Sequence, residues 1–174
     1  AVPRRKTRAR MKPLLPILAA AGLLVLAGPA TAQNASQIAQ VRGGANCPRC
    51  NLFQADLSGL ALKGRNLAGA RLRQADLSLA EMNRTSFAGG DLRDVNFYGG
   101  VFGGASFAGA NLTNASLVGA YLEGANFRGA TLAGANLSGA EMDRAVGLTQ
   151  AQLNRACGDM STRLPRGLSV PACR

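Results

Sequence analysis

The chain has 174 residues, a length that suits one domain with extensions. Hydrophobic residues make up 47% of it, yet only 5% are aromatic and 22 residues are glycine, which predicts a narrow core of Leu, Ala and Gly. The sequence has no histidine, which removes the commonest general base and metal ligand, and part of the net charge of +11 is confined to the first twelve residues.

Residues 1–32 have the pattern of a secretory signal peptide. Six basic residues precede an uncharged apolar run, Leu14 to Gly28, and Ala30-Thr31-Ala32 supplies a small-x-small cleavage site. The run is shorter than the roughly 20 residues of a spanning helix and contains Pro16, so we expect cleavage before Gln33 and no stable membrane span. The remaining chain would keep 14 basic and 9 acidic residues, which favours solubility. We therefore expect an exported protein, either periplasmic or secreted.

Residues 33–49 contain a predicted short helix. The stretch "NASQIAQVRGG" carries Ile38 and Val41 at helical spacing and ends at Gly43-Gly44. The sequence Cys47-Pro-Arg-Cys50 follows it.

From Leu52 to Met142 the sequence repeats with a period of five. Every fifth residue is large and apolar, nineteen times without exception, as 12 Leu, five Phe and two Met. Two positions before each of these central residues lies a column of mainly small residues, of which 12 are Ala. Two positions after each central residue, 12 of 19 residues are Gly. This period belongs to neither an α-helix nor a plain β-strand.

The spacing predicts that each five-residue unit forms one side of a coil. On an extended segment, residues two apart point the same way, so the small and central residues face inward while the polar residue between them faces outward. The following Gly permits a tight turn. Phe87, Phe107 and Phe127 recur at a step of 20, which predicts four sides per coil and a stacked solenoid. With about 4.8 Å between stacked strands, the rod would be roughly 23 Å long.

These repeats strongly resemble the pentapeptide-repeat proteins, whose consensus is A(D/N)LxG. The stretches "QADLSLA", "AGANLTNASLVGAYLEGANF" and "LAGANLSGAEM" carry the resemblance, which covers residues 50–144. It implies a right-handed quadrilateral β-helix with central and small residues inside. The column of small residues departs from the pattern at several positions, and Arg65 leads us to expect a local distortion of the coil. These departures are Leu60, Arg65, Thr85, Gly90, Val95 and Gly100.

Both ends of such a rod need covers, because open edges invite other chains to pair. Residues 33–49 are predicted to cap the N-terminal end, and residues 145–174 the C-terminal end. In "GLTQAQLNRACG", Thr149 is a good N-cap with Gln152 at the capping-box position, so we expect a helix to about Cys157 that stops at Gly158.

The four cysteines form two sequence-local pairs, Cys47 with Cys50 and Cys157 with Cys173. A single zinc site would need both pairs together, but the rod holds them roughly 20 Å apart. In an exported chain, two local disulfides are the simplest interpretation. The flanks "CPRCNLFQADLSGL" and "CGDMSTRLPRGLSVPAC" also resemble those of exported bacterial members of the family. The alternative is a thiol-disulfide redox protein that uses Cys47 and Cys50, although no βαβ context surrounds them.

No grouping of residues predicts catalysis. The carboxylates scatter over different sides, and phosphate loops and metal-ligand spacings are missing from the sequence, so we expect neither enzymatic activity nor a cofactor. Nucleic-acid binding would need a basic stripe with aromatic platforms, whereas the arginines have acidic neighbours. Some cytosolic members of the family imitate DNA and bind topoisomerases, which demands an acidic rod, so a topoisomerase ligand is the least favoured alternative.

The remaining hypothesis is a non-catalytic structural or protein-interaction module, with an unidentified protein partner and room for homo-oligomers. One side is predicted to be flat and nearly uncharged, and flat surfaces of small residues can pack closely on another protein. Its predicted contact residues are Asn66, Ala68, Ser86, Ala88, Ser106, Ala108, Asn126 and Arg128.

Overall fold

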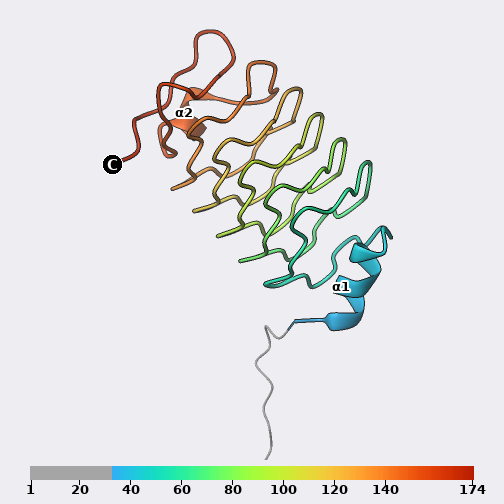
Figure 1. Cartoon of the computed structure of the whole chain (residues 1–174). Coiled ribbons are helices and arrows are strands. Elements are labelled where there is room, and N and C mark those ends of the chain that lie inside the picture. The colour runs from blue at the N-terminus through green and yellow to red at the C-terminus, as the bar shows by residue number, and fades with distance from the viewer. Residues whose placement is uncertain (1–32) are drawn as a thin grey trace, which may run out of the picture.

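Stacked four-sided coils make up most of the computed structural model, which describes residues 33–174 (Figure 1). Each outward residue between a small and a central position forms a parallel bridge with the residue 20 positions further on, from Asn51 with Arg71 to Asn126 with Val146. The predicted step of 20 is therefore confirmed. The predicted signal peptide lies outside the described residues.

The bridged residues define four sides, which we number in chain order. Within residues 33–174 the coils pair only through such single-residue bridges, without longer strands. Side 1 carries Asn51, Arg71, Asp91, Asn111 and Thr131; side 2 carries Asp56, Asp76, Asn96, Ser116 and Asn136; side 3 carries Ala61, Glu81, Val101, Tyr121 and Glu141; and side 4 carries Asn66, Ser86, Ser106, Asn126 and Val146.

A tight turn forms each corner between two sides. The carbonyl of a central residue accepts the N–H three residues on, as in Phe107 O with Ala110 N at 3.0 Å. Except at Arg144, the residue two positions after the centre has a positive φ, 66° at Gly109, as the third residue of a type II turn requires. Glycine adopts this conformation without steric cost. Six other residues adopt it at corners between Leu52 and Met142, namely Gln54, Gln74, Leu79, Arg84, Asp94 and Asn114.

The interior is a continuous column of apolar side chains. Every central residue from Leu52 to Met142 is buried, at most 4% exposed. Phe107 stacks on Phe87 and Phe127, with ring centroids 5.3 and 5.1 Å apart, and meets Phe97 and Phe102 edge-on. Aromatic contacts of these two geometries add to the hydrophobic stabilisation of burial.

The phenylalanines around Gly100 account for a glycine at a position where the repeat usually has alanine. A Cβ at this position would stand inside contact distance of the Phe102 ring and 3.2 Å from the carbonyl oxygen of Ala80. The ring of Phe102 cannot move away freely, because it packs against Phe97 at 5.0 Å between centroids. The missing side chain thus makes room for a larger neighbour.

We therefore expect Gly100→Ala to destabilise the rod by about 1–3 kcal/mol through overpacking. In a Phe102→Leu background the same change should cost less, because the shorter side chain frees the space. Denaturant unfolding of the single and double variants gives the coupling energy. Gly90→Ala is the control, since a Cβ there would meet backbone oxygens of Phe87 and Ala70 but no ring. Additive single and double effects would contradict this account.

Thr85 and Arg65, which both depart from the column of small residues, are joined by a hydrogen bond. The N–H of Arg65, which at this turn position would bond to the carbonyl of Leu62, donates instead to Thr85 Oγ1 at 3.3 Å. The Thr85 hydroxyl in turn donates to Leu62 O at 2.8 Å, so this fully buried polar group is satisfied. The predicted distortion at Arg65 is therefore confined to one turn, and the ladder continues past it, with Ser86 N donating to Arg65 O at 2.8 Å.

Helix α1 (Ala35–Arg42) covers the N-terminal end of the rod (Figure 1). Asn34 caps it by accepting a hydrogen bond from Gln37 N, and Val41 is buried against the first coil. The ladder begins close to it, because Cys47 N already donates to Asn66 O at 2.9 Å.

Helix α2 (Gln150–Leu153) lies over the other end and has the predicted capping box between Thr149 and Gln152. The helix is shorter than predicted, however, and ends four residues before Cys157. The reason is that Cys157 joins the ladder, donating to Ala135 O at 2.9 Å, while Arg163 bridges to Glu141. Extended pairing with the last full coil takes precedence over one more helical turn, and the tail closes the open edge.

Candidate functional site

The eight predicted contact residues lie together on side 4, and we call this surface the alanine face. The parallel bridges join Asn66, Ser86, Ser106 and Asn126 in one column. Beside that column, Gly69 N donates to Ala88 O and Gly89 N to Ala108 O, both at 2.8 Å, which aligns the alanines. The structure thus brings all eight residues onto one surface, which comprises Asn66, Ala68, Ser86, Ala88, Ser106, Ala108, Asn126 and Arg128.

The polar groups of the alanine face mainly serve the local backbone. Asn66 Oδ1 accepts the N–H of Ala68 and Asn126 Oδ1 that of Arg128, each at 3.0 Å. Such bonds from an amide oxygen to the backbone two residues on are typical of turns. The alanines are half-buried, and arginines border the surface, with Arg49 lying over Gly69 at one end and Arg128 at the other. The face therefore offers close packing rather than directed chemistry.

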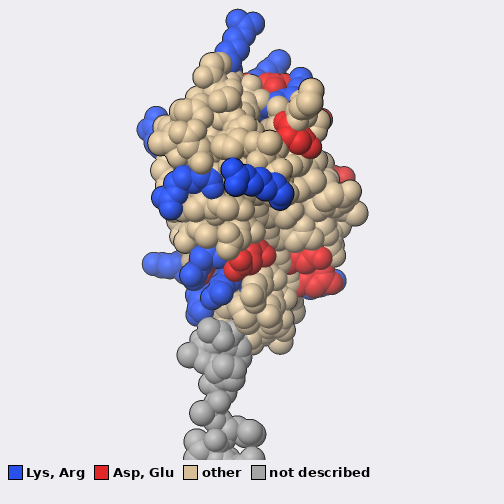
Figure 2. Space-filling model, turned by 90° about the vertical axis from the view of Figure 1, so that its left-hand side faces the viewer, with Lys and Arg blue, Asp and Glu red and all other residues tan. Residues whose placement is uncertain are grey.

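Several charged side chains outside the alanine face form ion pairs with neighbours. On side 1 the guanidinium of Arg93 donates two hydrogen bonds of 2.7 Å to Asp91, and these bonds hold the pKa of Asp91 below its usual range. Arg73 pairs with Asp94 at 3.5 Å. In the view of Figure 2 the cations lie mainly on one half of the surface and the carboxylates on the other, without a continuous basic stripe. The face in this view therefore gives no support to nucleic-acid binding, which would use such a stripe.

Both predicted cysteine pairs are disulfides in the structure, and their surroundings differ. Cys47 and Cys50, with Cα atoms 5.5 Å apart, are only 4% and 7% exposed, because they occupy a central and a small position of the five-residue pattern. Cys157 and Cys173, with Cα atoms 4.8 Å apart, are partly exposed. The N-terminal disulfide is thus part of the core, whereas the C-terminal one faces solvent.

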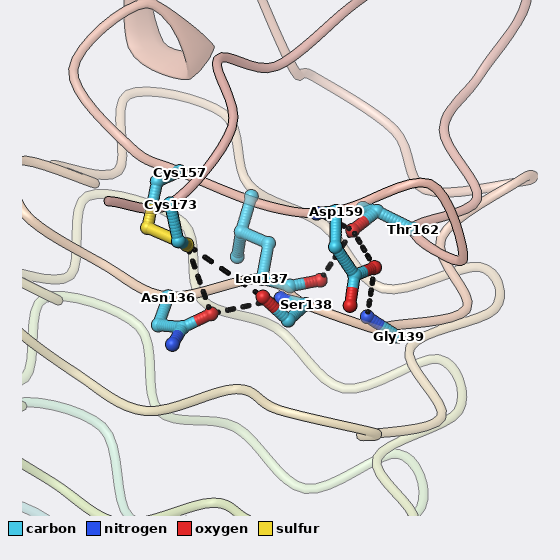
Figure 3. Close-up of a disulfide and its surroundings, with 8 residues drawn as sticks. All are labelled: Asn136, Leu137, Ser138, Gly139, Cys157, Asp159, Thr162 and Cys173. Carbon is cyan, nitrogen blue, oxygen red and sulfur yellow. Dashed lines mark hydrogen bonds between the residues drawn. A yellow bond between two sulfur atoms is a disulfide. The ribbon is translucent and has the colours of Figure 1, made fainter.

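The C-terminal disulfide belongs to a polar cluster that fastens the tail to side 2 (Figure 3). Cys173 Sγ lies 3.6 Å from the hydroxyl of Ser138. Nearby, Asp159 Oδ1 accepts hydrogen bonds from the hydroxyl of Ser161 at 2.7 Å and from Gly139 N at 3.0 Å. These bonds, that from Ser161 first, lower the pKa of Asp159. Asp159 and Cys173 also line a cavity of about 370 Å³, but Cys173 is held in the disulfide and Asp159 accepts hydrogen bonds from the tail and from side 2, so both residues serve to fasten the tail.

Reactive chemistry finds little support among the described residues. No group of three or more His, Cys, Asp or Glu residues within 33–174 could hold a metal ion. In the same part of the chain, no helix combines the length and apolar character needed to cross a membrane. The cavities found there are shallow, and one of about 250 Å³ is lined by both acids and arginines.

One exposed surface was missed by the sequence interpretation. It runs over the corner between sides 2 and 3, and we call it the apolar strip. Tyr98 follows Asn96 of side 2 and Tyr121 belongs to side 3, so the two tyrosines lie on adjacent sides. The available signal was Leu79, a large apolar residue at a corner position where glycine is usual. The apolar strip comprises Leu79, Tyr98, Val101, Val118 and Tyr121.

The coil geometry defines a class of protein, the β-solenoids with four-sided coils of 20 residues. The chain belongs to the pentapeptide-repeat family, because the family model described as pentapeptide repeats matches it in eight copies, at residues 66–99, 91–129, 105–144 and 121–157. Proteins of this family are typically structural or interaction proteins.

Two solved structures illustrate the likeness. HetL from Nostoc sp. strain PCC 7120, a pentapeptide repeat protein involved in heterocyst differentiation regulation, is 39% identical, with a TM-score of 0.57 over 59% of this chain and 49% of HetL. A pentapeptide repeat protein from the Arabidopsis thaliana thylakoid lumen is 33% identical over 51% of this chain and 54% of its own, with a TM-score of 0.30. The chain thus spans about half the length of each. The likeness to HetL supports a right-handed quadrilateral β-helix. None of the curated proteins searched matches the chain.

Proposed function

We propose that the protein is an exported, non-catalytic module that binds another protein through the alanine face. The observation that carries the proposal is the alignment of Ala68, Ala88 and Ala108 over successive coils, with uncharged Asn and Ser residues beside them. A rigid flat surface with short side chains loses little side-chain entropy when a partner packs on it. The same regularity serves a purely structural rod, and homo-oligomers would use the same kind of contact.

Export is the second part of the proposal. It is supported by the charge and hydropathy pattern of residues 1–32 and by two paired disulfides, which persist in oxidising compartments. Fusion of residues 1–32 to a reporter enzyme that is active only outside the cytoplasm tests it. A reporter that stays inactive and uncleaved would argue against export.

The redox alternative is weakened by the burial of Cys47 and Cys50. A reactive cysteine must be reachable as a thiolate, and sulfurs placed in the core at 4% and 7% exposure of their residues are not readily attacked. We expect the protein to be inactive in an insulin-reduction assay.

Replacing both Ala88 and Ala108 with Arg should abolish capture of a partner through the alanine face. Two long cations would project from a surface that needs close approach, while the core stays intact because both residues point outward. The measurement is cross-linked affinity capture from the periplasmic fraction. Ala133→Arg is the matched control, since it makes the same change at the equivalent position of side 1. If the double variant captures the partner as well as the original chain does, the partner does not bind at the alanine face.

A further inference from the structure

The backbone conformation of Leu79 is energetically unfavourable. Its φ of 57° lies in the left-handed region, which is unfavourable for a side chain with a Cβ, and most corners of the rod use glycine there. The residue is also 61% exposed, so it gains little from burial. A residue that is both strained and exposed has no evident role in folding, and such positions concentrate at functional sites.

Leu79 is one end of a continuous apolar surface. Its N–H donates to Tyr98 O at 2.8 Å, and Gly99 N donates to Val118 O at 2.9 Å, so these residues follow one another over three coils. The side chain of Leu79 lies on Gly99, with Cδ2 3.0 Å from the point where a Cβ of Gly99 would stand.

The apolar surface continues around the corner onto side 3. Only Gly99 and Gly100 separate Tyr98 from Val101, and Val101 bridges directly to Tyr121. Gly100 faces the interior, and Gly99 at the corner has no side chain to interrupt the surface, so the apolar strip joins the two sides. Tyr98 is 54% and Tyr121 41% exposed.

The size of the apolar strip decides between a second copy of the chain and a smaller partner. Five partly exposed side chains supply on the order of 400 Å² of apolar area, about half of the roughly 800 Å² that each partner contributes to a stable protein interface. Patches of this size on monomers are often functional. A short peptide segment fits the available area, whereas a dimer would need more.

The strip ends at carboxylates. Tyr121 also lines the cavity of about 250 Å³ on side 3, together with Glu123, Glu141 and Asp143. The cavity already holds a guanidinium, because Arg163 pairs with Glu141 at 3.6 Å and with Asp143 at 2.5 Å. Glu123 accepts a hydrogen bond from the backbone N–H of Arg144 at 3.1 Å, and the guanidinium of Arg144, whose side chain is 88% exposed, approaches the same oxygen to 3.9 Å. The only cation that pairs with Glu123 among residues 33–174 is therefore a solvent-exposed one. An aromatic ring beside a carboxylate suits an ammonium or guanidinium group.

We propose that the apolar strip binds an extended apolar peptide segment of a partner protein, with a lysine or arginine of that segment held by Tyr121 and Glu123. Aliphatic side chains of the segment pack on Leu79, Tyr98 and Val118. The inference goes beyond the proposed function, because it places a binding surface across the rod from the alanine face and defines what it binds.

Tyrosine fluorescence gives a direct readout. The chain contains no tryptophan, and its two tyrosines, Tyr98 and Tyr121, both belong to the apolar strip. When a synthetic peptide without aromatic residues is added, the tyrosine fluorescence therefore comes from this surface alone. The probe is a nine-residue peptide of alternating Leu and Val around a central Lys, titrated into the full chain. Two comparison peptides replace Lys by Glu, or Leu and Val by Ser. We expect saturable binding of the first peptide, and at least tenfold weaker binding of the other two.

Three variants locate the binding. Leu79→Gly should weaken binding of the Lys peptide at least tenfold. It should not lower the melting temperature, because glycine adopts the positive φ at this corner without strain. Gln74→Gly is its matched control, making the same backbone change at the preceding corner, and should leave affinity unchanged. Glu123→Gln should remove the preference for Lys over Glu in the peptide.

The outcomes separate the proposals. Equal binding of the Lys and Glu peptides, or unchanged affinity in Leu79→Gly, would overturn the inference. Binding to phosphatidylcholine vesicles in place of all peptides would overturn it too, by assigning the strip to a lipid surface. The Ala88→Arg and Ala108→Arg variant should bind the peptide normally, so failure of the alanine face leaves this result unaffected.

Discussion

Replacing Phe107 with Asp is expected to unfold the rod. Phe107 is fully buried and stacks between Phe87 and Phe127 at the middle of the interior column. Loss of a buried aromatic ring alone costs about 3–5 kcal/mol. A carboxylate left without partners in the same place adds the large penalty of burying a charge. The total is comparable to the net stability of a typical domain, about 5–15 kcal/mol.

Circular dichroism during heating measures this effect. Phe107→Leu is the conservative comparison and should stay folded, because most central positions already carry Leu, with a loss of about 1–3 kcal/mol for the smaller side chain. Ala108→Asp is the positional control. It introduces the same charge one residue later on the outward alanine face, and its melting temperature should be close to that of the original chain. A Phe107→Asp variant that melts normally would mean that the inward assignment is wrong.

Most of the fold could be predicted from the sequence, because one short pattern recurs nineteen times. Leu52 and Met142, at the two ends of the pattern, are both buried as the spacing predicts. The three aligned phenylalanines predicted the step of 20, and the bridges confirm it. In a solenoid each contact lies between equivalent positions of successive coils, so periodicity alone specifies which residues meet.

The irregular positions could not be predicted in the same way. The hydroxyl of Thr85 replaces a turn bond of Arg65, and this depends on a contact between two different coils. The length of α2 also depends on a tertiary choice, because Cys157 can extend the helix or pair with the last coil. Helical propensity describes only the first of these options, so the helix predicted from the sequence is longer than α2.

The candidate surfaces differ in how well the sequence indicated them. The alanine face was visible as a column with a step of 20 from Asn66 to Asn126, and the structure assembles it as one side. The apolar strip was not visible, because its members occupy three different positions of the five-residue pattern. Tyr98 and Val101 become neighbours only when the corner at Gly99 and Gly100 is folded. A surface that crosses a corner has no single period in the sequence.

Removing the C-terminal disulfide by Cys157→Ala with Cys173→Ala should cost about 3 kcal/mol, the chain-entropy value for a loop of this size. The two cysteines are 16 residues apart. Removing Cys47 and Cys50 in the same way should cost less through chain entropy, about 2 kcal/mol, since they are only 3 residues apart. Intact mass before and after reduction must first show a gain of two hydrogens per disulfide; four free thiols would defeat the premise.

Removal of the two disulfides should also increase local opening in different parts of the structure. Without the C-terminal disulfide, the tail keeps its cluster at Asp159 and the pair of bonds between Gly158 and residues 171 and 173, at 2.8 and 2.9 Å. We therefore expect faster amide hydrogen exchange in residues 158–174 while the central coils stay protected, because local opening does not require the core to separate. Loss of the buried N-terminal pair should instead expose the first coil. Uniformly faster exchange along the whole rod in both variants would show that the ends do not open independently, and would contradict the local role of each disulfide.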